Sequence, residues 1–451
     1  MDPHSVKVSV QQGVPTRVRW GILAMLFAAT TLNYADRATI SIAGPEISKA
    51  LGLSPVQMGF VFSAFAWSYV VAQLPCGWLL DRFGSRKVYF YSILFWSVFT
   101  LLCGFAGFLP VGIALGTLFA LRLLVGAAEA PAFPANSRIT SAWFPTAERG
   151  TAAAIFNSAQ YFATVLFGPF MAWLVHRFGW QSVFYVMGVL GVCMAWLWLR
   201  RIHGPLQHPG INELELDYIQ AGGALVQVEG GGGSGARPAG ADRTRGIIRQ
   251  LLGSRMLLGI YIAQYGITAL TYFFLTWFPV YLVKERHMSI LNAGFVAVLP
   301  AVAGFVGGVL GGMISDRMIR AGWSQSVARK TPIVGGMLAA MSMVVCNYVS
   351  TDWVVIAVMS LAFFGKGVGA LGWAVVADTS PPEAGGLSGA LFNTFGNTAG
   401  ITTPIVIGYI IQSTGSFANA LVFIGANALM TIVCYLFVVG EIRRFTLKPV
   451  E

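Results

Sequence analysis

Apolar runs of roughly 20 residues recur along most of this 451-residue chain. Each run can cross the hydrocarbon core of a bilayer as a helix, because that core is about 30 Å thick. The runs do not alternate between apolar and polar residues, as the strands of a membrane β-barrel do. Only 10% of the residues are charged, against about a quarter in soluble domains. We therefore expect an all-α polytopic membrane protein.

The pattern predicts twelve spans, near residues 20–41, 56–80, 88–108, 111–134, 150–174, 181–199, 256–282, 291–314, 332–349, 353–377, 385–412 and 417–440. One long polar stretch divides them into an N-terminal six-helix bundle (1–201), a linker loop (202–255) and a C-terminal six-helix bundle (256–451). Within the linker, residues 212–217 predict a short amphipathic helix and residues 230–238 a flexible segment.

The net charge of +11 does not indicate nucleic-acid binding, because the basic residues follow the loops. The loops on one side of the predicted spans contain only Lys49, Arg177, Lys284 and Arg286. Nearly all the other basic residues lie on the opposite side, together with both termini and the long linker. The positive-inside rule makes that side cytoplasmic. We expect a multi-pass protein of the plasma membrane (the inner membrane of a bacterium), surrounded by lipid, with cytoplasmic termini.

The two halves of the chain repeat each other at a nearly constant offset. Asp81-Arg82 recurs as Asp316-Arg317, and Pro169 recurs as Pro404, in both cases 235 positions later. Several such matches in register indicate duplication of a six-helix unit. Because each half has an even number of spans, the copies share one orientation, as in transporters built from parallel repeats. Such folds bind their substrate between the halves, near the middle of the membrane.

A glycine- and charge-containing motif follows the second span of each half. Its two copies are Gly77-Trp-Leu-Leu-Asp81-Arg82-Phe-Gly84-Ser-Arg86-Lys87 and Gly312-Met-Ile-Ser-Asp316-Arg317. Together with twelve spans, this duplicated motif resembles the major facilitator superfamily. The resemblance implies a conformational latch, in which Asp81 and nearby basic residues pair with a helix end across the halves in the outward-open state. Alternatively, the basic residues only anchor the loop at the cytoplasmic surface.

Five ionisable residues interrupt the predicted spans, namely Asp36, Arg37, Arg122, Glu129 and Lys366. A charge at the bilayer centre costs about 2.5–3.5 kcal/mol on insertion scales, and such residues mark substrate or proton paths. Arg122 and Glu129 are two helical turns apart, so both lie on one face of their span. Burial disfavours an ionised carboxyl and a nearby arginine favours it, which suits Asp36 or Glu129 to exchange protons. The alternative is a permanently ionised structural pair.

Four segments refine the resemblance: Asn33–Arg37, Phe62–Trp67, Glu129–Pro134 and Phe274–Pro279. Over nearly its whole length the chain resembles the sugar-acid branch of the anion:cation symporter family. The resemblance implies that Asp36 and Glu129 accept protons and that Arg37 binds a substrate carboxylate. It also implies that Arg122 tunes Glu129 electrostatically. The implied sugar-acid contacts are Tyr34, Tyr69, Gln160, Trp373 and Asn393.

Lys366 bears on the choice of substrate. It lies in the glycine-rich stretch Phe363–Trp373, which resembles the glucarate and galactarate transporters of the family. The resemblance implies that galactonate-type members have a neutral residue at this position. Arg37 from one half and Lys366 from the other would each hold one carboxylate of a six-carbon dianion. Alternatively, Lys366 extends toward the membrane interface or balances an acid.

Polar side chains within the spans would bind the substrate's hydroxyl groups, although single amides also join membrane helices. These side chains are Asn157, Gln160, Asn393, Asn397, Gln264, Tyr265 and Tyr272. The sequence thus predicts a monomeric secondary transporter that imports a sugar-acid dianion, glucarate or galactarate, with protons by alternating access. Two alternatives are a proton symporter for a monocarboxylate such as galactonate or a hexuronate, and an organic-anion exchanger without proton coupling.

An enzyme is not expected, because the sequence contains no HExxH or GxSxG motif and no cluster of histidines and cysteines. The five cysteines are scattered and form no CxxC pair. We therefore expect no metal site and no cofactor.

Overall fold

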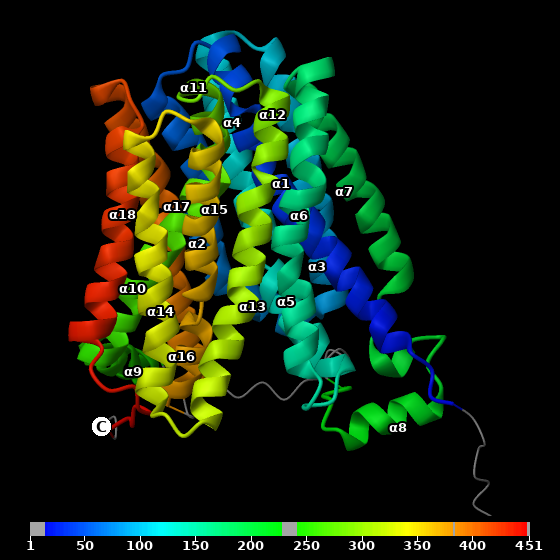
Figure 1. Ribbon diagram of the computed structural model, residues 1–451. Coiled ribbons are helices and arrows are strands. Elements are labelled where there is room, and N and C mark those ends of the chain that lie inside the picture. The colour runs from blue at the N-terminus through cyan, green and yellow to red at the C-terminus, as the bar shows by residue number, and fades with distance from the viewer. Residues whose placement is uncertain (1–13, 228–240, 382–383, 449–451) are drawn as a thin grey trace, which may run out of the picture.

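The computed structural model describes residues 14–227, 241–381 and 384–448. Within these ranges the chain contains helices and no strand, and the long helices stand side by side in one bundle (Figure 1). All twelve predicted spans coincide with long helical segments there, which confirms the all-α membrane fold of two six-helix repeats. The predicted flexible segment, residues 230–238, lies outside the described residues.

The first half supplies six spans. Their helices are α1 (Val18–Ala50), α2 (Pro55–Phe83), α3 (Ser85–Cys103) with a 3-10 turn (Gly104–Phe108), α4 (Val111–Glu129) followed by α5 (Ala132–Trp143), α6 (Arg149–Phe178) and α7 (Gln181–Arg201). The fourth span is broken between α4 and α5, at Pro131. Proline has no N–H to donate and its ring clashes with the preceding turn, so the helix cannot continue unchanged. The break directly follows Glu129.

The second half repeats this plan. Its helices are α10 (Arg255–Tyr272), a π-helical turn (Phe273–Trp277) and α11 (Phe278–Lys284), then α12 (Ile290–Val296) with α13 (Val298–Arg320), α14 (Gln325–Met341) with a 3-10 turn (Ser342–Tyr348), α15 (Asp352–Val368) with α16 (Gly372–Thr379), α17 (Gly385–Thr414), and α18 (Ala418–Val433) with a π-helical turn (Cys434–Val438). The tenth span is broken between α15 and α16, in the glycine-rich stretch that contains Lys366.

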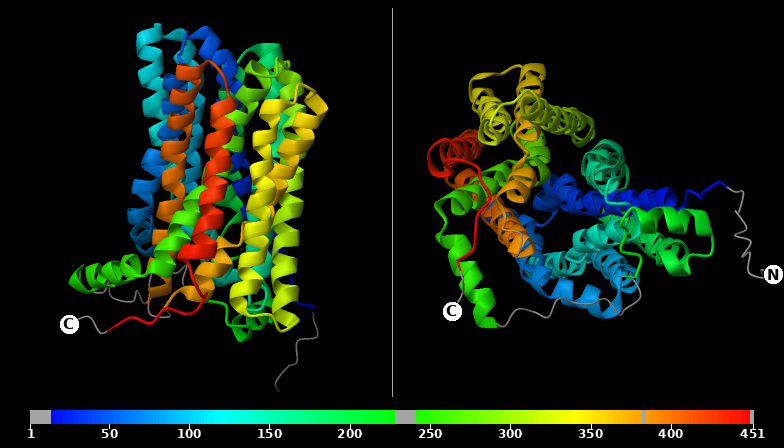
Figure 2. Two further views of the ribbon diagram at one scale, coloured as in Figure 1. Left: turned by 60° about the vertical axis from the view of Figure 1, so that its left-hand side comes forward. Right: turned by 90° about the horizontal axis from the view of Figure 1, so that it is seen from below.

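The same pairs of helices pack together within each half (Figure 2). In the first half α1 packs on α6, α2 on α4, and α3 on α7; in the second, α10 packs on α17, α13 on α15, and α14 on α18. The two halves meet where α2 packs on α17 and where α6 packs on α12 and α13. The fold therefore preserves the sequence repeat, with one seam between its copies.

Two of the bundle helices are less apolar than the rest. Ten helical segments of the described chain are long and apolar enough to cross a membrane, and α1 and α17 are not among them. Both are long enough, at 33 and 30 residues. Their polar residues explain the difference, because α1 contains Asn33, Asp36 and Arg37 and α17 contains Asn393 and Asn397. Both helices that fall short of the apolar criterion thus carry candidate site residues.

We call the end of the bundle where α1 begins the terminal end, since the C-terminal tail also lies there, and the opposite end the far end (Figure 1). Toward the far end the two halves are tightly packed. A Cβ atom on Gly59 of α2 would lie only 2.6 Å from the carbonyl oxygen of Pro404 in α17, so this crossing requires glycine. The Phe62 and Trp277 rings also pack edge to face across the seam, 5.2 Å apart. These contacts close the far end beside the seam.

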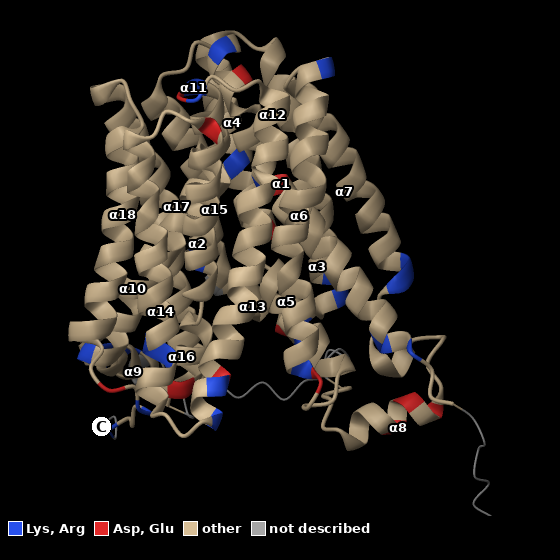
Figure 3. Ribbon diagram, viewed as in Figure 1, with Lys and Arg blue, Asp and Glu red and all other residues tan. Residues whose placement is uncertain are grey.

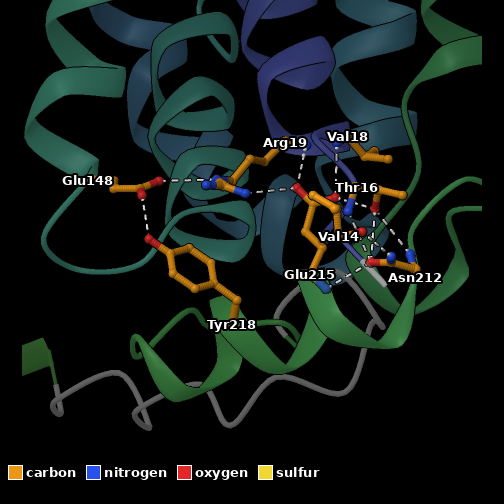
Figure 4. A network of polar contacts seen from close by, with 8 residues as sticks. All are labelled: Val14, Thr16, Val18, Arg19, Glu148, Asn212, Glu215 and Tyr218. Carbon is orange, nitrogen blue, oxygen red and sulfur yellow. Dashed lines mark hydrogen bonds and ion pairs between the residues drawn. The ribbon is translucent and has the colours of Figure 1, made fainter. Parts of the chain in front are cut away.

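The charged residues gather mainly at the terminal end, which also carries the linker helices α8 (Glu213–Ala221) and α9 (Ala241–Gly253) (Figure 3). The predicted amphipathic helix is α8, capped by Asn212. Its buried Glu215 accepts hydrogen bonds from the backbone N–H groups of Val18 and Arg19 (Figure 4). A carboxylate there satisfies free donors at a helix N-terminus and opposes the positive end of the dipole. The linker thus caps α1.

Candidate functional site

Four charged side chains of the first half form two buried ion pairs. The Nε of Arg37 donates to Oε2 of Glu129 at 2.8 Å, and Nη1 of Arg122 lies 3.9 Å from Oδ2 of Asp36. None of the four residues is more than 9% exposed. Two come from α1 and two from α4, so the pairs link these helices. With all four groups ionised, the cluster carries no net charge.

The pairing follows from helix geometry. Asp36 and Arg37 are consecutive, so their side chains point about 100° apart around α1 and reach different partners. The ion pair of Arg122 is with Asp36, and Arg37 is the direct partner of Glu129. Two turns of α4 separate Arg122 from Glu129, so any influence of Arg122 on Glu129 acts through space and not through an ion pair. That Arg122 tunes Glu129 stays a prediction.

Several polar atoms of this cluster are buried without a hydrogen-bond partner among the described residues. They include Nη2 of Arg37, Oε1 of Glu129, Oδ2 of Asp36 and Nη1 of Arg122. A buried polar atom left unbonded costs about 1–3 kcal/mol, so proteins usually satisfy such atoms. Arg37 therefore retains free donor capacity beside its bond to Glu129, and each carboxyl retains a free oxygen. These are the atoms that can take up a proton or a ligand oxygen.

Aromatic rings hold the Arg37 guanidinium from several sides. Its central carbon lies 5.1 Å from the ring centroid of Tyr34, 4.6 Å from that of Phe65 and 4.8 Å from that of Tyr69. The face of an aromatic ring attracts a cation, more strongly where water is excluded. Tyr272 of the second half also lies close enough to interact with the guanidinium. The cage therefore fixes Arg37 at the seam between the halves.

A cavity adjoins this cage and is lined by both halves. Tyr34, Gln160 and Tyr161 line it from the first half, and Thr271 and Phe363 from the second. Tyr34 is also one of the rings around Arg37, so the cavity lies next to that guanidinium. Its position between the repeats is where parallel-repeat transporters bind their substrates.

Lys366, in the second half, packs against a ring that lines the same cavity. Its Nζ lies 5.1 Å from the ring centroid of Phe363, which lines the cavity. The side chain is 6% exposed, and no carboxylate of the described residues forms an ion pair with it. A Cβ on neighbouring Gly367 would lie 2.2 Å from the carbonyl oxygen of Gly304, so α13 packs directly on this turn. The packing buries a cation without giving it a counter-ion.

A chain of three amides and one phenol connects the two halves. The Tyr272 hydroxyl donates to Oδ1 of Asn397 at 3.4 Å, and Nδ2 of Asn397 donates to Oδ1 of Asn393 at 3.0 Å. Nδ2 of Asn393 donates in turn to Oε1 of Gln73, on α2, at 2.9 Å. The chain thus runs from beside Arg37 across the seam. The structure therefore brings three of the expected hydroxyl-binding residues together.

Other expected contact residues have different partners. Nδ2 of Asn157 donates to the Ala153 carbonyl, Nε2 of Gln160 to the Asn157 carbonyl, and Nε2 of Gln264 to Oγ1 of Thr268. The Tyr265 hydroxyl bonds Oγ1 of Thr402, and the Trp373 ring packs edge to face on Phe392. Of these five, only Gln160 lines the cavity next to the cage. The structure does not place Trp373 against the charged cluster.

The latch residues lie at the terminal end. Asp81 forms an ion pair with Arg138 of α5, in its own half, and Asp316 pairs with Arg329 at 3.4 Å in the second half. Arg82 stacks on Trp78 and Phe83, Arg86 donates to the Leu199 carbonyl, and Gly84 joins α2 to α3 with a φ of 78°. Gly77 is free of close contacts, and Lys87 and Arg317 are exposed. In this conformation Asp81 is therefore held by an arginine of the first half.

The comparison with known proteins agrees with this geometry. The family model described as Major Facilitator Superfamily matches residues 26–346. The chain belongs to the major facilitator superfamily. Its fold also matches the crystal structure of a D-xylose-proton symporter, with a TM-score of 0.70 at 15% identity over 94% of this chain and 98% of that one. The protein is therefore a membrane transporter by family and not an enzyme.

Full-length relatives are more specific. The chain is 60% identical to a probable galactarate/D-glucarate transporter, GudP, of Escherichia coli (strain K12), over 96% of each chain. It is 59% identical to a probable galactarate/D-glucarate transporter of Bacillus subtilis (strain 168), over 97% of this chain and 96% of the relative. Identity to a D-galactonate transporter of E. coli O6:H1 is 39%, over 97% and 99%. Similarity is thus higher to proteins named for dicarboxylates than to this one named for a monocarboxylate.

Sequence reasoning missed two residues that the structure places in the site. Phe65 lies under both Arg37 and Arg122, yet one phenylalanine among 32 carries no signal by itself. Gln73 is different, because an amide within an apolar span needs a partner. Only the fold shows that this partner is Asn393, on the other half.

Proposed function

We propose that this protein is a proton-coupled importer of galactarate or D-glucarate that works by alternating access. The observation that carries the proposal is that each half holds a buried cation against an aromatic ring, and that both rings line one cavity. Tyr34 packs on Arg37 and Phe363 on Lys366, so one ring separates each cation from the cavity. A six-carbon dianion has one carboxylate at each end, so each cation neutralises one end. The names of the relatives support the same substrates.

Proton coupling follows from the ion pair between Arg37 and Glu129. While Glu129 is ionised, it engages the Nε of Arg37 and neutralises the guanidinium. Protonation of Glu129 removes that negative charge, and the unpaired guanidinium then favours a substrate carboxylate. Asp36 and Arg122 form the second pair and respond in the same way. Proton uptake and anion binding therefore support each other, which is the requirement for symport.

The hydroxyl groups of the substrate replace hydrogen bonds within the polar chain. Asn393 and Asn397 present amide donors and acceptors near the seam, together with the Tyr272 hydroxyl. A site that bonds hydroxyls rejects analogues without them, because buried donors would be left unpaired.

The paired seam at the far end opens and the terminal end closes during each cycle, with Asp81 and its motif as the latch.

The orientation in the membrane follows from the loop charges. The terminal end, which holds most of the basic residues, faces the cytoplasm of a bacterial inner membrane. A single chain contains both halves of the site, so the protein works as a monomer. Import thus moves the dianion from the far end to the terminal end.

Transport by purified protein in liposomes tests the proposal. Labelled galactarate and D-glucarate should accumulate when the pH outside is lower than inside, and should only equilibrate without the gradient. Uptake driven by internal galactarate but indifferent to the pH gradient would instead establish an exchanger. Unlabelled D-galactonate should compete more weakly than D-glucarate. Equal competition by the two would favour a monocarboxylate transporter.

A further inference from the structure

A second cavity lies at the terminal end of the second half, away from the substrate site. It is bounded by α9, the start of α10, the end of the last span and the tail that follows it. Its wall contains four basic side chains, Arg255, Arg443, Arg444 and Lys448, and one acidic side chain, Glu441. The cavity therefore carries an excess of positive charge, which favours an anionic ligand.

Specific hydrogen bonds hold the tail around this cavity, although it has no regular secondary structure. Lys448 and Gln250 exchange two bonds, of 2.8 and 3.1 Å, between the Lys448 backbone and the Gln250 side chain. The backbone N–H of Ile442 donates to Oγ of Ser326, and that of Phe445 to the Thr379 carbonyl. The tail is thus fixed to α9 of the linker and to α14 and α16 of the second half. The basic residues between these points are held at the cavity.

The surroundings place the cavity at the level of the lipid headgroups. Helix α9 projects sideways from the bundle at the terminal end (Figure 2). It is amphipathic, with Leu251 fully buried and Arg249 exposed, as in helices that lie at a membrane surface. Phe437, which ends the last span beside the cavity, is 68% exposed and turns an apolar ring outward. The cavity therefore has lipid on one side and water on the other.

We propose that this cavity binds the phosphate headgroup of an anionic phospholipid from the leaflet at the terminal end. Guanidinium groups pair with phosphate oxygens through parallel N–H donors, and the cavity offers three of them. The acyl chains then lie along the apolar surface next to Met256 and Phe437, which also line the cavity. A zwitterionic headgroup carries its own ammonium and leaves the cavity's positive charge less well balanced.

The test compares two arginine pairs on the full-length protein. Arg443→Gln/Arg444→Gln removes two charges from the cavity wall. Arg200→Gln/Arg201→Gln is the matched control, because it removes an adjacent arginine pair after the sixth span of the first half. Binding of phosphatidylglycerol and phosphatidylcholine to detergent-purified protein is measured by native mass spectrometry. Each Lys or Arg near an anionic surface strengthens binding about fivefold, so the loss of two should lower phosphatidylglycerol affinity roughly 25-fold. The control should lose less than twofold.

Further arms keep the result interpretable. Arg443→Lys/Arg444→Lys keeps the charges and should retain most of the affinity. If the glutamine variant does not fold, a phosphatidylglycerol carrying a photoreactive headgroup should still crosslink wild-type protein within residues 249–256 or 437–448. Equal losses in both glutamine variants would overturn the proposal, as would crosslinking elsewhere. Displacement of the lipid by millimolar glycerol phosphate would also overturn it, since the ligand would then be a soluble anion.

Discussion

The two halves of this transporter share one helix arrangement, but their polar groups at the seam differ. The first half presents two acids and two arginines, which pair with each other inside the bundle. The second half presents amides and phenols and the buried cation Lys366, for which the described residues supply no acidic partner. Each half alone gives an incomplete site. Together they line one cavity, and in each half a buried cation lies against a ring of its lining, Arg37 against Tyr34 and Lys366 against Phe363.

This difference shows how a duplicated fold can divide one task. In the first half each carboxyl is paired with an arginine of the same half. The carboxyl can take up or release a proton there without any change in the packing between the halves. A cation without a counter-ion in the protein needs one from a ligand. The first half is therefore suited to proton exchange. The second half is suited to recognising the second carboxylate of the substrate, at its far end, and its hydroxyl groups. The variants below test this division, beginning with the largest expected effect.

Glu129→Gln should abolish accumulation against a gradient, because glutamine resembles the protonated acid and cannot release a proton. Exchange of labelled for unlabelled galactarate across the liposome membrane should persist, since Arg37 is free to bind a carboxylate. Asp36→Asn should also uncouple transport, with an added change in affinity through its neighbour Arg37. The measurement compares pH-driven uptake with exchange. Concentrative uptake by Glu129→Gln would show that coupling does not depend on this acid.

Lys366→Asn should discriminate between substrate classes. Leaving one buried carboxylate unpaired costs about 3–5 kcal/mol, so galactarate affinity should fall by roughly 100-fold or more. D-Galactonate has no charge at that end and should change by less than threefold. Arg37→Gln, on the first half, should weaken both ligands by about the larger amount. Competition binding with the two acids measures both variants.

Lys366→Arg serves as the control, because it keeps the charge and should retain part of the preference for the dicarboxylate. A loss of similar size for galactarate and D-galactonate in Lys366→Asn would refute the model of two clamps. Lys366 would then be a structural charge, and the division between the halves would concern protons alone.

Gln73→Leu removes the hydrogen bond that crosses the seam to Asn393. Hydrogen bonds contribute about 1 kcal/mol each, so galactarate affinity should fall roughly fivefold as Asn393 loses its fixed orientation. Adipate has the same two carboxylates without hydroxyls and should bind both proteins within twofold. Asn393→Leu should show the same dependence on hydroxyls. If adipate and galactarate are affected alike, Gln73 supports the packing of the halves and not the reading of hydroxyls.

Asp81→Asn should give the smallest effect, and on rate more than on binding. The Asp81 side chain is 69% exposed, and exposed ion pairs contribute at most about 1 kcal/mol, so the maximal rate should fall up to about fivefold. The Michaelis constant should stay within twofold, because the pair is far from the cavity. Asp316→Asn should slow transport less, since Arg329 also bonds Asp378 at 2.8 Å. A large change in affinity with an unchanged rate would contradict the latch.

Much of the fold could be predicted because the lengths of the apolar runs and the offset of the repeat can be read directly from the sequence. The charged residues of the site could also be named, since a charge within an apolar span is conspicuous. Their pairing could not be predicted, because it depends on how α1 crosses α4, and this decides that Arg37 and not Arg122 bonds Glu129. The partner of Gln73 could not be predicted either, because it depends on how α2 crosses α17. Trp373 was expected in the site from resemblance alone; its ring packs edge to face on Phe392 and is 56% exposed, and its contact with substrate stays a prediction.

The polarity of α1 and α17 also affects how the protein is made. Helix α1 leaves the ribosome before α4, yet it contains Asp36 and Arg37 and falls outside the group of strongly apolar segments. Its free energy of insertion as a lone helix is therefore poor. Stable integration has to await α4, whose Arg122 and Glu129 neutralise those charges. The ion pairs that serve transport in the finished protein would thus first serve its biogenesis, by retaining a helix that lipid alone would not hold.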